Sequence, residues 1–231
     1  MSIEQKFILT GDLNFMGLGN AKHVFERIRS ELWAADAVIS NLECCFVANE
    51  GTANNQSCTG HFYERSGQRE GFYAHPAAVK ALKAANITMV GNANNTNFGD
   101  NAIRSTIAVL NDQQIAFSGV GKNWEEACQP ALKTINGIRV GLIQRTSVYW
   151  PSNHEASASH PGVATVKIHT AYSPKIDGYA SNRPGTPPDI HTWADKKYLK
   201  NLVTQIHKLR ETTDILITSF HWGYKEDVLD Y

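Results

Sequence analysis

Cysteine is scarce in this chain and forms no recognised ligand or disulfide pattern. Four of the 231 residues are cysteine, and two of them, Cys44 and Cys45, are adjacent, while no pair has Cys-x-x-Cys spacing. This arrangement suits neither a zinc cage nor a disulfide-rich secreted scaffold. We therefore expect reduced thiols, with Cys44 and Cys45 acting as small buried hydrophobic side chains.

The chain also lacks an excess of charge and any long apolar run. Lys plus Arg and Asp plus Glu number 22 each, so the formal net charge is zero, which argues against a nucleic-acid partner. No stretch approaches the roughly 20 apolar residues of a membrane span, and Glu4 and Lys6 make the amino terminus too charged for a signal peptide. We expect no membrane partner and a cytoplasmic location.

What remains is an alternation of strand-like and helix-like segments. Apolar runs predict strands at 6–12, 36–44, 87–93, 115–121, 135–146 (entered by a hairpin turn at Asn136-Gly137) and 213–223. Helical spacing of apolar residues predicts helices through Val24, Ile28 and Leu32, and at 75–86, 101–114 and 195–211. The alternation predicts an α/β fold with a mainly parallel sheet, in a single domain over residues 1–231.

Two polar stretches interrupt this alternation. Residues 48–71, rich in Asn, Gly, Ser and Gln, are expected to leave the core. Residues 147–192, rich in Pro, Ser, His and Gly, are too long for an ordinary connection, so we expect a functional loop or lid. The histidines of this region could contact a substrate, and an ordinary surface position without a function is an equal alternative. They are His154, His160, His169 and His191.

Polar side chains follow four of the predicted strands. They are Asp12 and Asn14, Asn41 and Glu43, the Asn94-Asn95-Thr96 turn, and His221. Because the carboxyl ends of parallel strands share one edge, these groups are expected to converge there. Oxygen and nitrogen ligands of this kind suit Mn, Fe, Zn or Mg. The structural alternatives are a turn cap for Asp12, ordinary turn asparagines, and a hydrogen-bonded core histidine for His221.

Several segments carry a resemblance to a known family. GDLNFMG, DAVISNLE, ANNTNFGD, the Gly-Val-Gly at 119–121 and SFHWG occur in the order and spacing of the CapA family. That family is named for capsule and poly-γ-glutamate synthesis and is similar to the calcineurin-like metallophosphoesterases. The resemblance covers essentially the whole chain. It implies a metallophosphoesterase-like two-sheet α/β sandwich with a metal site at the strand ends.

The resemblance also implies roles for individual residues. It makes Asp12, Glu43, Asn95 and His221 the metal ligands, with a divalent Mn, Fe, Zn or Mg as cofactor. Glu43, His221 and Asn94 are the candidate catalytic groups of the same turn and strand ends. From its own position at the end of a predicted strand, Arg145 is a candidate clamp for a carboxylate or phosphate, and an exposed structural arginine is the alternative.

The sequence departs from the family pattern at two predicted site positions and at the carboxyl end of the chain. Thr96 replaces the histidine of the family's Asn-Asn-His turn, and Gly99 stands where the family has aspartate. The chain ends soon after its His-Trp-Gly, before the family's further histidine motif. We therefore expect a chain truncated at its carboxyl end that binds metal weakly or not at all in isolation. The apolar strand at 213–223 is expected to be interior, its far edge paired by a continuation, a swapped element or a partner chain, which leaves a homo-oligomer open.

The function predicted from these features is a CapA-like, metal-assisted hydrolase of an amide or phosphoester. Its substrate would be a small molecule, a peptide, a glutamyl polymer or a phosphorylated compound, a choice that rests on the family name alone. Two alternatives stay open. One is a metal-independent acid/base enzyme, an epimerase or isomerase, that uses Glu43 and His221. The other is a non-catalytic, polymer-binding subunit of poly-γ-glutamate synthesis.

Overall fold

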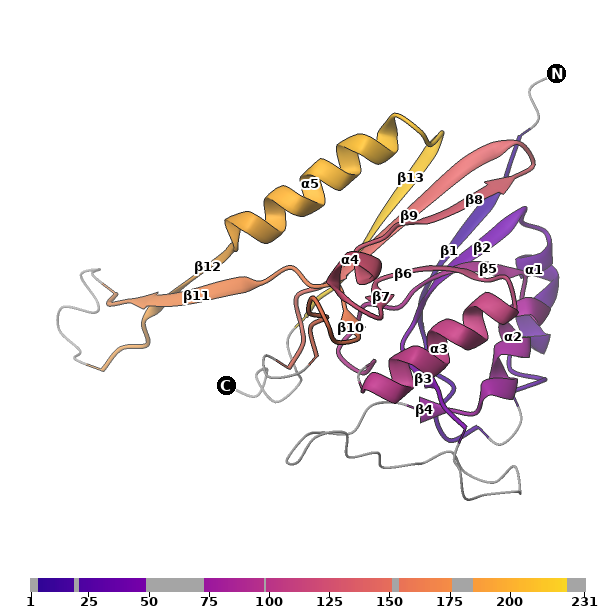
Figure 1. Cartoon of the computed structure of the whole chain (residues 1–231), viewed down its shortest axis with the longest axis horizontal. Helices are drawn as coiled ribbons and strands as arrows, with labels where there is room; N and C mark the ends of the chain where they lie inside the picture. The colour runs from indigo at the N-terminus through magenta and orange to yellow at the C-terminus, as the bar shows by residue number, and fades with distance from the viewer. Residues whose placement is uncertain are drawn as a thin grey trace.

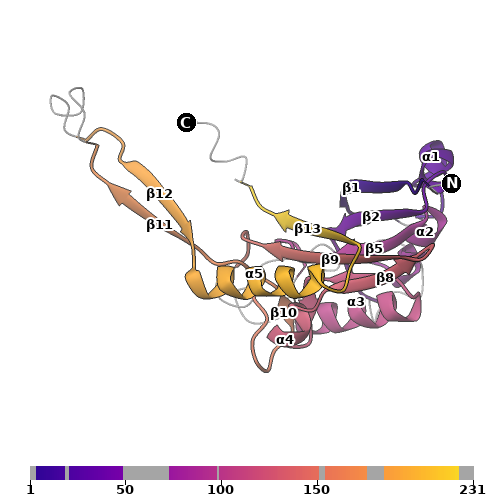
Figure 2. The same ribbon diagram turned by 90° about the horizontal axis from the view of Figure 1, so that it is seen from above.

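Two β-sheets face each other, and helices cover their outer surfaces (Figure 1 and Figure 2). The computed structural model describes residues 4–18, 21–48, 73–97, 99–150, 154–175 and 185–223. Nearly all of the polar stretch at 48–71 lies outside these ranges. The layers run helices, sheet, sheet, helix, which confirms the α/β sandwich of two sheets predicted from the sequence.

The first sheet is entirely parallel, with strand order β1-β2-β5-β6. Its strands are β1 (Phe7–Leu13), β2 (Ala37–Leu42), β5 (Ile87–Gly91) and β6 (Ala116–Ser118). The helices on its outer face are η1 (Glu26–Ile28), α1 (Arg29–Trp33), η2 (Pro76–Ala78), α2 (Val79–Ala84) and α3 (Asp100–Asp112). Every residue of β2 is buried, because this strand has a neighbour on each edge and a layer on each face.

The second sheet has the order β13-β9-β8, from β8 (Ala131–Ile135), β9 (Ile138–Thr146) and β13 (Ile215–His221). Strands β8 and β9 form the predicted hairpin, where Asn136 and Gly137 both have positive φ, 47° and 86°. Helix α5 (Lys196–Arg210) covers the outer face, and its Leu202 and Leu209 pack with Ile143 of β9.

An apolar core fills the space between the sheets. Side chains from β1, β2 and β5 meet those of β8 and β9 there; the buried ones are Ala37, Ile39, Met89, Ala131, Ile135, Val140 and Leu142. Full burial of a side chain such as Met89 stabilises the fold by about 1.5–3 kcal/mol. Along β9, successive side chains alternate between this inner core and the layer of α5. That alternation decides which strand-end groups face the other sheet.

The predicted strand at 115–121 is divided in two. Strand β6 ends at Ser118, and β7 (Val120–Gly121) pairs instead with β10 (Gly162–Val163) next to the short helix α4 (Trp124–Ala127). Gly119 lies between them with φ of 103°, and a Cβ at this position would come within 2.6 Å of Ala93. The positive φ turns the chain out of the first sheet. A second small pair joins β3 (Cys45–Phe46) to β4 (Tyr73–Ala74).

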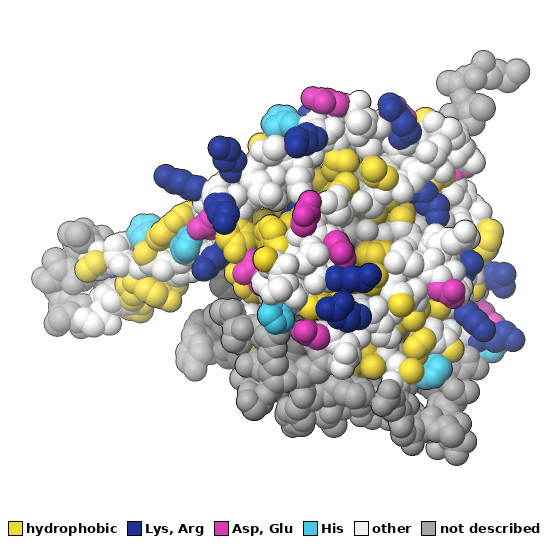
Figure 3. Space-filling view, in the orientation of Figure 1, with side chains coloured by type: hydrophobic (Ala, Val, Ile, Leu, Met, Phe, Trp, Pro, Cys, Tyr) yellow, Lys and Arg dark blue, Asp and Glu magenta, His cyan; other side chains and the backbone are white. Residues whose placement is uncertain are grey.

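The predicted lid region is more regular than a loop. Besides β10 it contains β11 (Ile168–Ser173) and β12 (Asp189–Ala194), an antiparallel pair that projects from the body of the molecule (Figure 1). Residues 151–153 and 176–184 of this region lie outside the described ranges. Figure 3 shows apolar side chains along this projecting pair, where Tyr172 is 68% exposed and Ile190 63% exposed.

Strand β13 is less buried than its apolar sequence suggests. Within the described residues it pairs with β9 alone, so it is an edge strand, and Ile215 and Phe220 are 36% and 40% exposed. The burial on both faces that the apolar run predicts is not seen within the described residues, which also contain no strand on the far edge of β13. Its apolar run does pack on one side, where Ile217 joins the core between the sheets. Among the described residues, no helix has the length and apolar character needed to cross a membrane.

Candidate metal-binding site

Three ionisable groups meet where the two sheets present their strand ends. Asp12 lies near the end of β1, Glu43 directly follows β2, and His221 is the last residue of β13. Their possible ligand atoms all lie within 4.8 Å of one another. Asn95 joins them, because its Oδ1 is 2.9 Å from Nε2 of His221. The structure thus brings together all of the residues that the sequence suggested as metal ligands.

Burial and the neighbouring Asp12 both disfavour the ionised form of Glu43 in this cluster. The pKa of Glu43 is raised to about 7, first by burial, then by the charge of Asp12 and by a hydrogen bond with Asp12. Burial lowers the pKa of His221, and the charge of Asp12 opposes that effect. Nε2 of His221 lies 3.9 Å from Oε1 of Glu43. Near neutral pH the cluster therefore contains a protonated or half-protonated Glu43 beside a neutral imidazole.

A chain of side-chain amides orients Asp12. Asn41 donates to Oδ1 of Asp12 at 2.7 Å, and Oδ1 of Asn41 accepts from Nε2 of Gln144 at 2.8 Å. Oε1 of Gln144 accepts from the backbone N–H of Ala93 at 2.6 Å. Gln144 comes from β9 of the second sheet, so the chain of amides crosses between the sheets. Gly91 leaves room for it, because a Cβ there would lie 2.4 Å from Cδ of Gln144.

The asparagine-rich turn after β5 fixes the end of β2. The backbone carbonyl of Leu42 accepts from three side-chain amides, those of Asn92 at 2.6 Å, Asn94 at 2.9 Å and Asn97 at 2.8 Å. The hydroxyl of Thr96 lies 3.1 Å from the backbone oxygen of Glu43. These contacts set the position of Glu43. Asn94 is fully buried and acts in this support, whereas its neighbour Asn95 faces His221.

Arg145 lies on the other face of β9. Its side chain is 1% exposed, and its guanidinium donates to the backbone oxygens of Gln144 and Cys128 and to the side chain of Gln205 on α5. Neighbouring strand residues point to opposite faces, and Gln144 already takes the inner one. The geometry therefore gives Arg145 a structural role between β9 and α5, away from the cluster, and does not support the anion clamp expected from its strand-end position.

Sequence reasoning missed the part played by His154. This side chain is fully buried; its Nε2–H donates to the backbone oxygen of Asn97 at 2.9 Å, and Nδ1 accepts from the N–H of Trp150 at 3.2 Å. Burial lowers its pKa to about 4, so the imidazole is neutral. His154 ties the segment after β9 to the asparagine turn. Its partners are backbone groups, one of them 57 positions away, and no sequence pattern marks such a contact.

Comparison with known proteins gives a consistent result. The model of the bacterial capsule synthesis protein family PGA_cap matches residues 6–230. A curated relative, the capsule biosynthesis protein CapA of Bacillus anthracis, is 22% identical over 171 residues, which cover 71% of this chain and 34% of that protein. The chain thus spans about a third of the length of the curated relative it matches. The family has a metallophosphoesterase-like fold, in agreement with the two-sheet sandwich.

Proposed function

The chain belongs to the bacterial capsule synthesis family PGA_cap, and from this premise we propose that its strand-end cluster binds a divalent metal and assists hydrolysis of an amide or phosphoester. One observation carries the proposal. Ligand atoms of Asp12, Glu43 and His221 lie within 4.8 Å of one another, although they come from three strands and from both sheets. Such convergence of ionisable groups is costly for a fold unless a positive charge offsets it.

The residues fit a divalent cation. Two carboxylates, an imidazole and the amide oxygen of Asn95 form a ligand set that suits Mn, Fe, Zn or Mg. The pKa of Glu43 is raised first by burial and then by the charge of Asp12, and a bound cation would oppose both effects. A bound cation would supply Lewis acidity and lower the pKa of a water molecule. Asp12, Glu43, Asn95 and His221 are the groups that would hold it.

The side chains have distinct parts in this proposal. Asp12 is fixed by Asn41, so its carboxylate keeps one orientation while a substrate binds. Glu43, with a pKa of about 7, can accept or release a proton close to neutral pH, as a general base or acid must. The neutral His221 can act as a hydrogen-bond donor from Nε2, where Asn95 now accepts. A glutamyl polymer or peptide is the substrate class we propose, by association with the family.

A specific observation also favours the metal-independent alternative. Glu43 and His221 lie 3.9 Å apart, with pKa values displaced by burial, in the arrangement of an acid and base pair. Such a pair could move a proton next to a carbonyl group, as an epimerase or isomerase does. The two functions differ in one respect that can be measured, because only the hydrolase needs a cation.

Isothermal titration calorimetry with Mn²⁺ and Zn²⁺ tests whether the cluster binds a divalent metal. We expect weak but saturable binding, because Thr96 and Gly99 replace a histidine and an aspartate of the family pattern. The affinity should fall by about a further tenfold or more in Glu43→Gln, because a ligand charge is lost. Glu31→Gln is the matched control, since Glu31 lies exposed on α1, and it should bind as the unaltered chain does. Equal binding by Glu43→Gln, or none at millimolar metal, contradicts the proposal. Activity that survives a chelator and is lost in Glu43→Gln would instead support the metal-independent enzyme.

We also propose a reducing compartment, the cytoplasm, for this chain. Cys44 and Cys128 are buried thiols outside any disulfide, and burial raises the pKa of both, which keeps them protonated and unreactive. Thiols of this kind suit a compartment in which disulfides do not form. Cell fractionation of the native protein tests the location, and recovery outside the cytoplasm would contradict it.

A further inference from the structure

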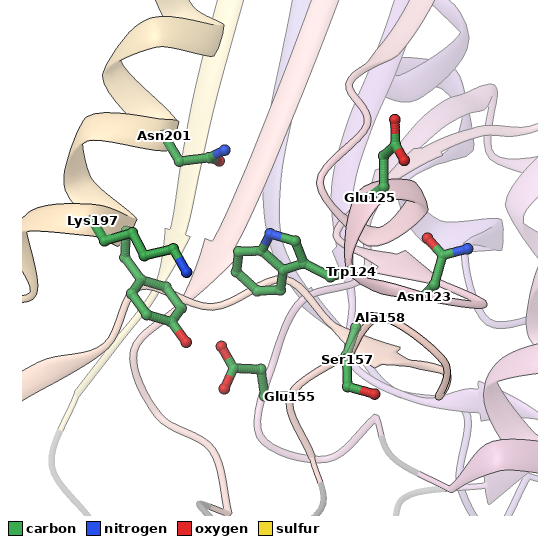
Figure 4. Close-up of a pocket in the computed structure, with 10 residues that line it drawn as sticks. Asn123, Trp124, Glu125, Glu155, Ser157, Ala158, Lys197 and Asn201 are labelled. Carbon is green, nitrogen blue, oxygen red and sulfur yellow. The ribbon is translucent and has the colours of Figure 1, made fainter.

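A cavity lies apart from the cluster, between α4, residues 155–158 and the first turns of α5 (Figure 4). Its volume is about 590 Å³, within the range of pockets that hold small ligands. None of the residues proposed as metal ligands lines it. The lining residues that matter for its chemistry are Trp124, Glu155, Lys197 and Tyr198.

Two aromatic rings form one wall of this cavity. The rings of Trp124 and Tyr198 meet edge to face, with centroids 5.4 Å apart and an interplanar angle of 78°. Their perpendicular packing holds the indole in place, and Figure 4 shows Trp124 at the centre of the group of lining side chains. Within the described residues, the indole N–H of Trp124 donates to no protein acceptor. The cavity therefore offers an aromatic face and an available hydrogen-bond donor.

Glu155 presents a fixed carboxylate beside these rings. Its Oε1 accepts from the hydroxyl of Thr165 at 2.7 Å, and it also accepts a hydrogen bond from the hydroxyl of Tyr198. No cationic side chain among the described residues forms an ion pair with it. The negative charge of Glu155 raises the pKa of Tyr149 and Tyr198, after the larger effect of burial on each. Glu155 is thus an oriented, half-buried anion whose charge no described group compensates.

Lys197 places the opposite charge at the same cavity. It lies in the first turn of α5, after the N-cap Asp195, and Figure 4 shows its ammonium group directed towards the space beside Trp124 and Glu155. In the part of the chain that the structure describes, Lys197 forms no ion pair with Glu155 or with any other carboxylate. Two opposite charges therefore flank one aromatic wall without forming an ion pair with each other.

We propose that this cavity binds a small zwitterion, a free amino acid or a dipeptide. The ligand's ammonium group would lie between the carboxylate of Glu155 and the indole face of Trp124, which attract a cation by charge and by the ring quadrupole. The ligand's carboxylate would accept from Lys197 and from the indole N–H. A neutral sugar could use the aromatic face as well, but it would leave both charges uncompensated. This inference does not depend on the proposed metal site.

Calorimetric titration of the whole chain with the dipeptide Ala-Ala tests the ligand class. We expect saturable binding that falls by roughly tenfold or more in Glu155→Gln and in Lys197→Met, since each removes one charge-assisted hydrogen bond. The N-acetylated, C-amidated form of Ala-Ala should bind at least as poorly, because it lacks both charges. Glu155→Gln keeps an oxygen acceptor for Thr165 and Tyr198, which protects the fold of the site.

Controls separate the cavity from the rest of the molecule. Lys200→Met and Glu31→Gln each remove one exposed charge that does not line the cavity, and both variants should bind Ala-Ala unchanged. Circular dichroism should show the same fold for every variant. The proposal is overturned by no binding of Ala-Ala at millimolar concentration, by equal binding of the capped peptide, or by saturable binding of glucose that Glu155→Gln and Lys197→Met leave intact.

Discussion

Nε2 of His221 lies 2.9 Å from Oδ1 of Asn95, although 126 positions separate the two residues in the sequence. An amide oxygen can only accept a hydrogen bond, so Nε2 of the neutral imidazole carries the proton. This contact joins the end of β13 in the second sheet to the turn after β5 in the first. The N–H at Nε2 of His221 therefore donates to Asn95, and a cation bound at Nε2 would have to displace that proton.

Metal binding is expected to strengthen as the pH rises. The pKa of Glu43 is raised to about 7, so below that pH a cation must compete with a proton for the carboxylate. Affinity for Mn²⁺ should rise by up to about tenfold per pH unit below 7 and change little above it. Titrations in buffers of different ionisation enthalpy at about pH 6 should also show proton release. An affinity that does not change between acid and neutral pH would show that Glu43 is no ligand.

The same shift predicts a pH dependence of folding stability. A folded-state pKa above the ordinary value of 4.5 means that, between 4.5 and about 7, the folded chain retains a proton that the unfolded chain releases. The free energy of unfolding should therefore fall as the pH rises through this window and level off above it. Glu43→Gln should reduce this fall, and Glu31→Gln should not. Urea midpoints at several pH values measure the difference, and parallel curves for all three proteins would contradict it.

The strands and the meeting of their ends were largely predictable. Apolar runs such as 87–93, closed by Gly and Asn, predict strands from local chemistry alone, and the shared edge of parallel strands places Asp12, Glu43 and His221 together. The face that Arg145 occupies was not predictable. Residues 140–146 of β9 are all buried, because a layer covers each face of the strand. The sequence alone therefore does not tell which alternate residues face the other sheet.

Contacts of side chains with backbone groups far away in the sequence could not be predicted either. His154 lies in a polar, proline-containing region that is typical of surface loops, yet its ring binds the backbone of the asparagine turn. The edge position of β13 depends on which strands surround it, and an apolar run does not specify that. Gln144 did leave a signal, as an amide near the end of a buried strand, but its partners are Asn41 of β2 and Ala93 in the turn after β5.

Gln144→Met should weaken metal binding although residue 144 is no ligand. Methionine keeps the volume and removes the amide that holds Asn41, so Asn41 no longer fixes Asp12. Loss of such a supporting contact typically lowers metal affinity by about 10- to 100-fold. Ser219→Ala is the control, because it removes a longer contact of Gln144, 3.3 Å, and should have little effect. Unchanged Mn²⁺ affinity in folded Gln144→Met would show that the chain of amides does not support the site.

Gly91→Ala should destabilise the fold through Gln144. A Cβ at residue 91 would lie 2.4–2.6 Å from the amide atoms of the Gln144 side chain, so that side chain must move and lose its contacts with Asn41 and Ala93. Overpacking of this kind typically costs about 1–3 kcal/mol in the free energy of unfolding. Gly11→Ala is the matched control, since nothing lies within 4 Å of a Cβ at that strand position.

The double variant Gly91→Ala/Gln144→Ala separates the steric effect from backbone strain. Removing the Gln144 side chain takes away the clash, so the cost of Gly91→Ala measured in the Gln144→Ala background should be much smaller than in the unaltered chain. Urea denaturation of the four proteins in this cycle measures the coupling. If Gly91→Ala costs the same in both backgrounds, the glycine is needed for its backbone, and the close approach of Gln144 does not explain it.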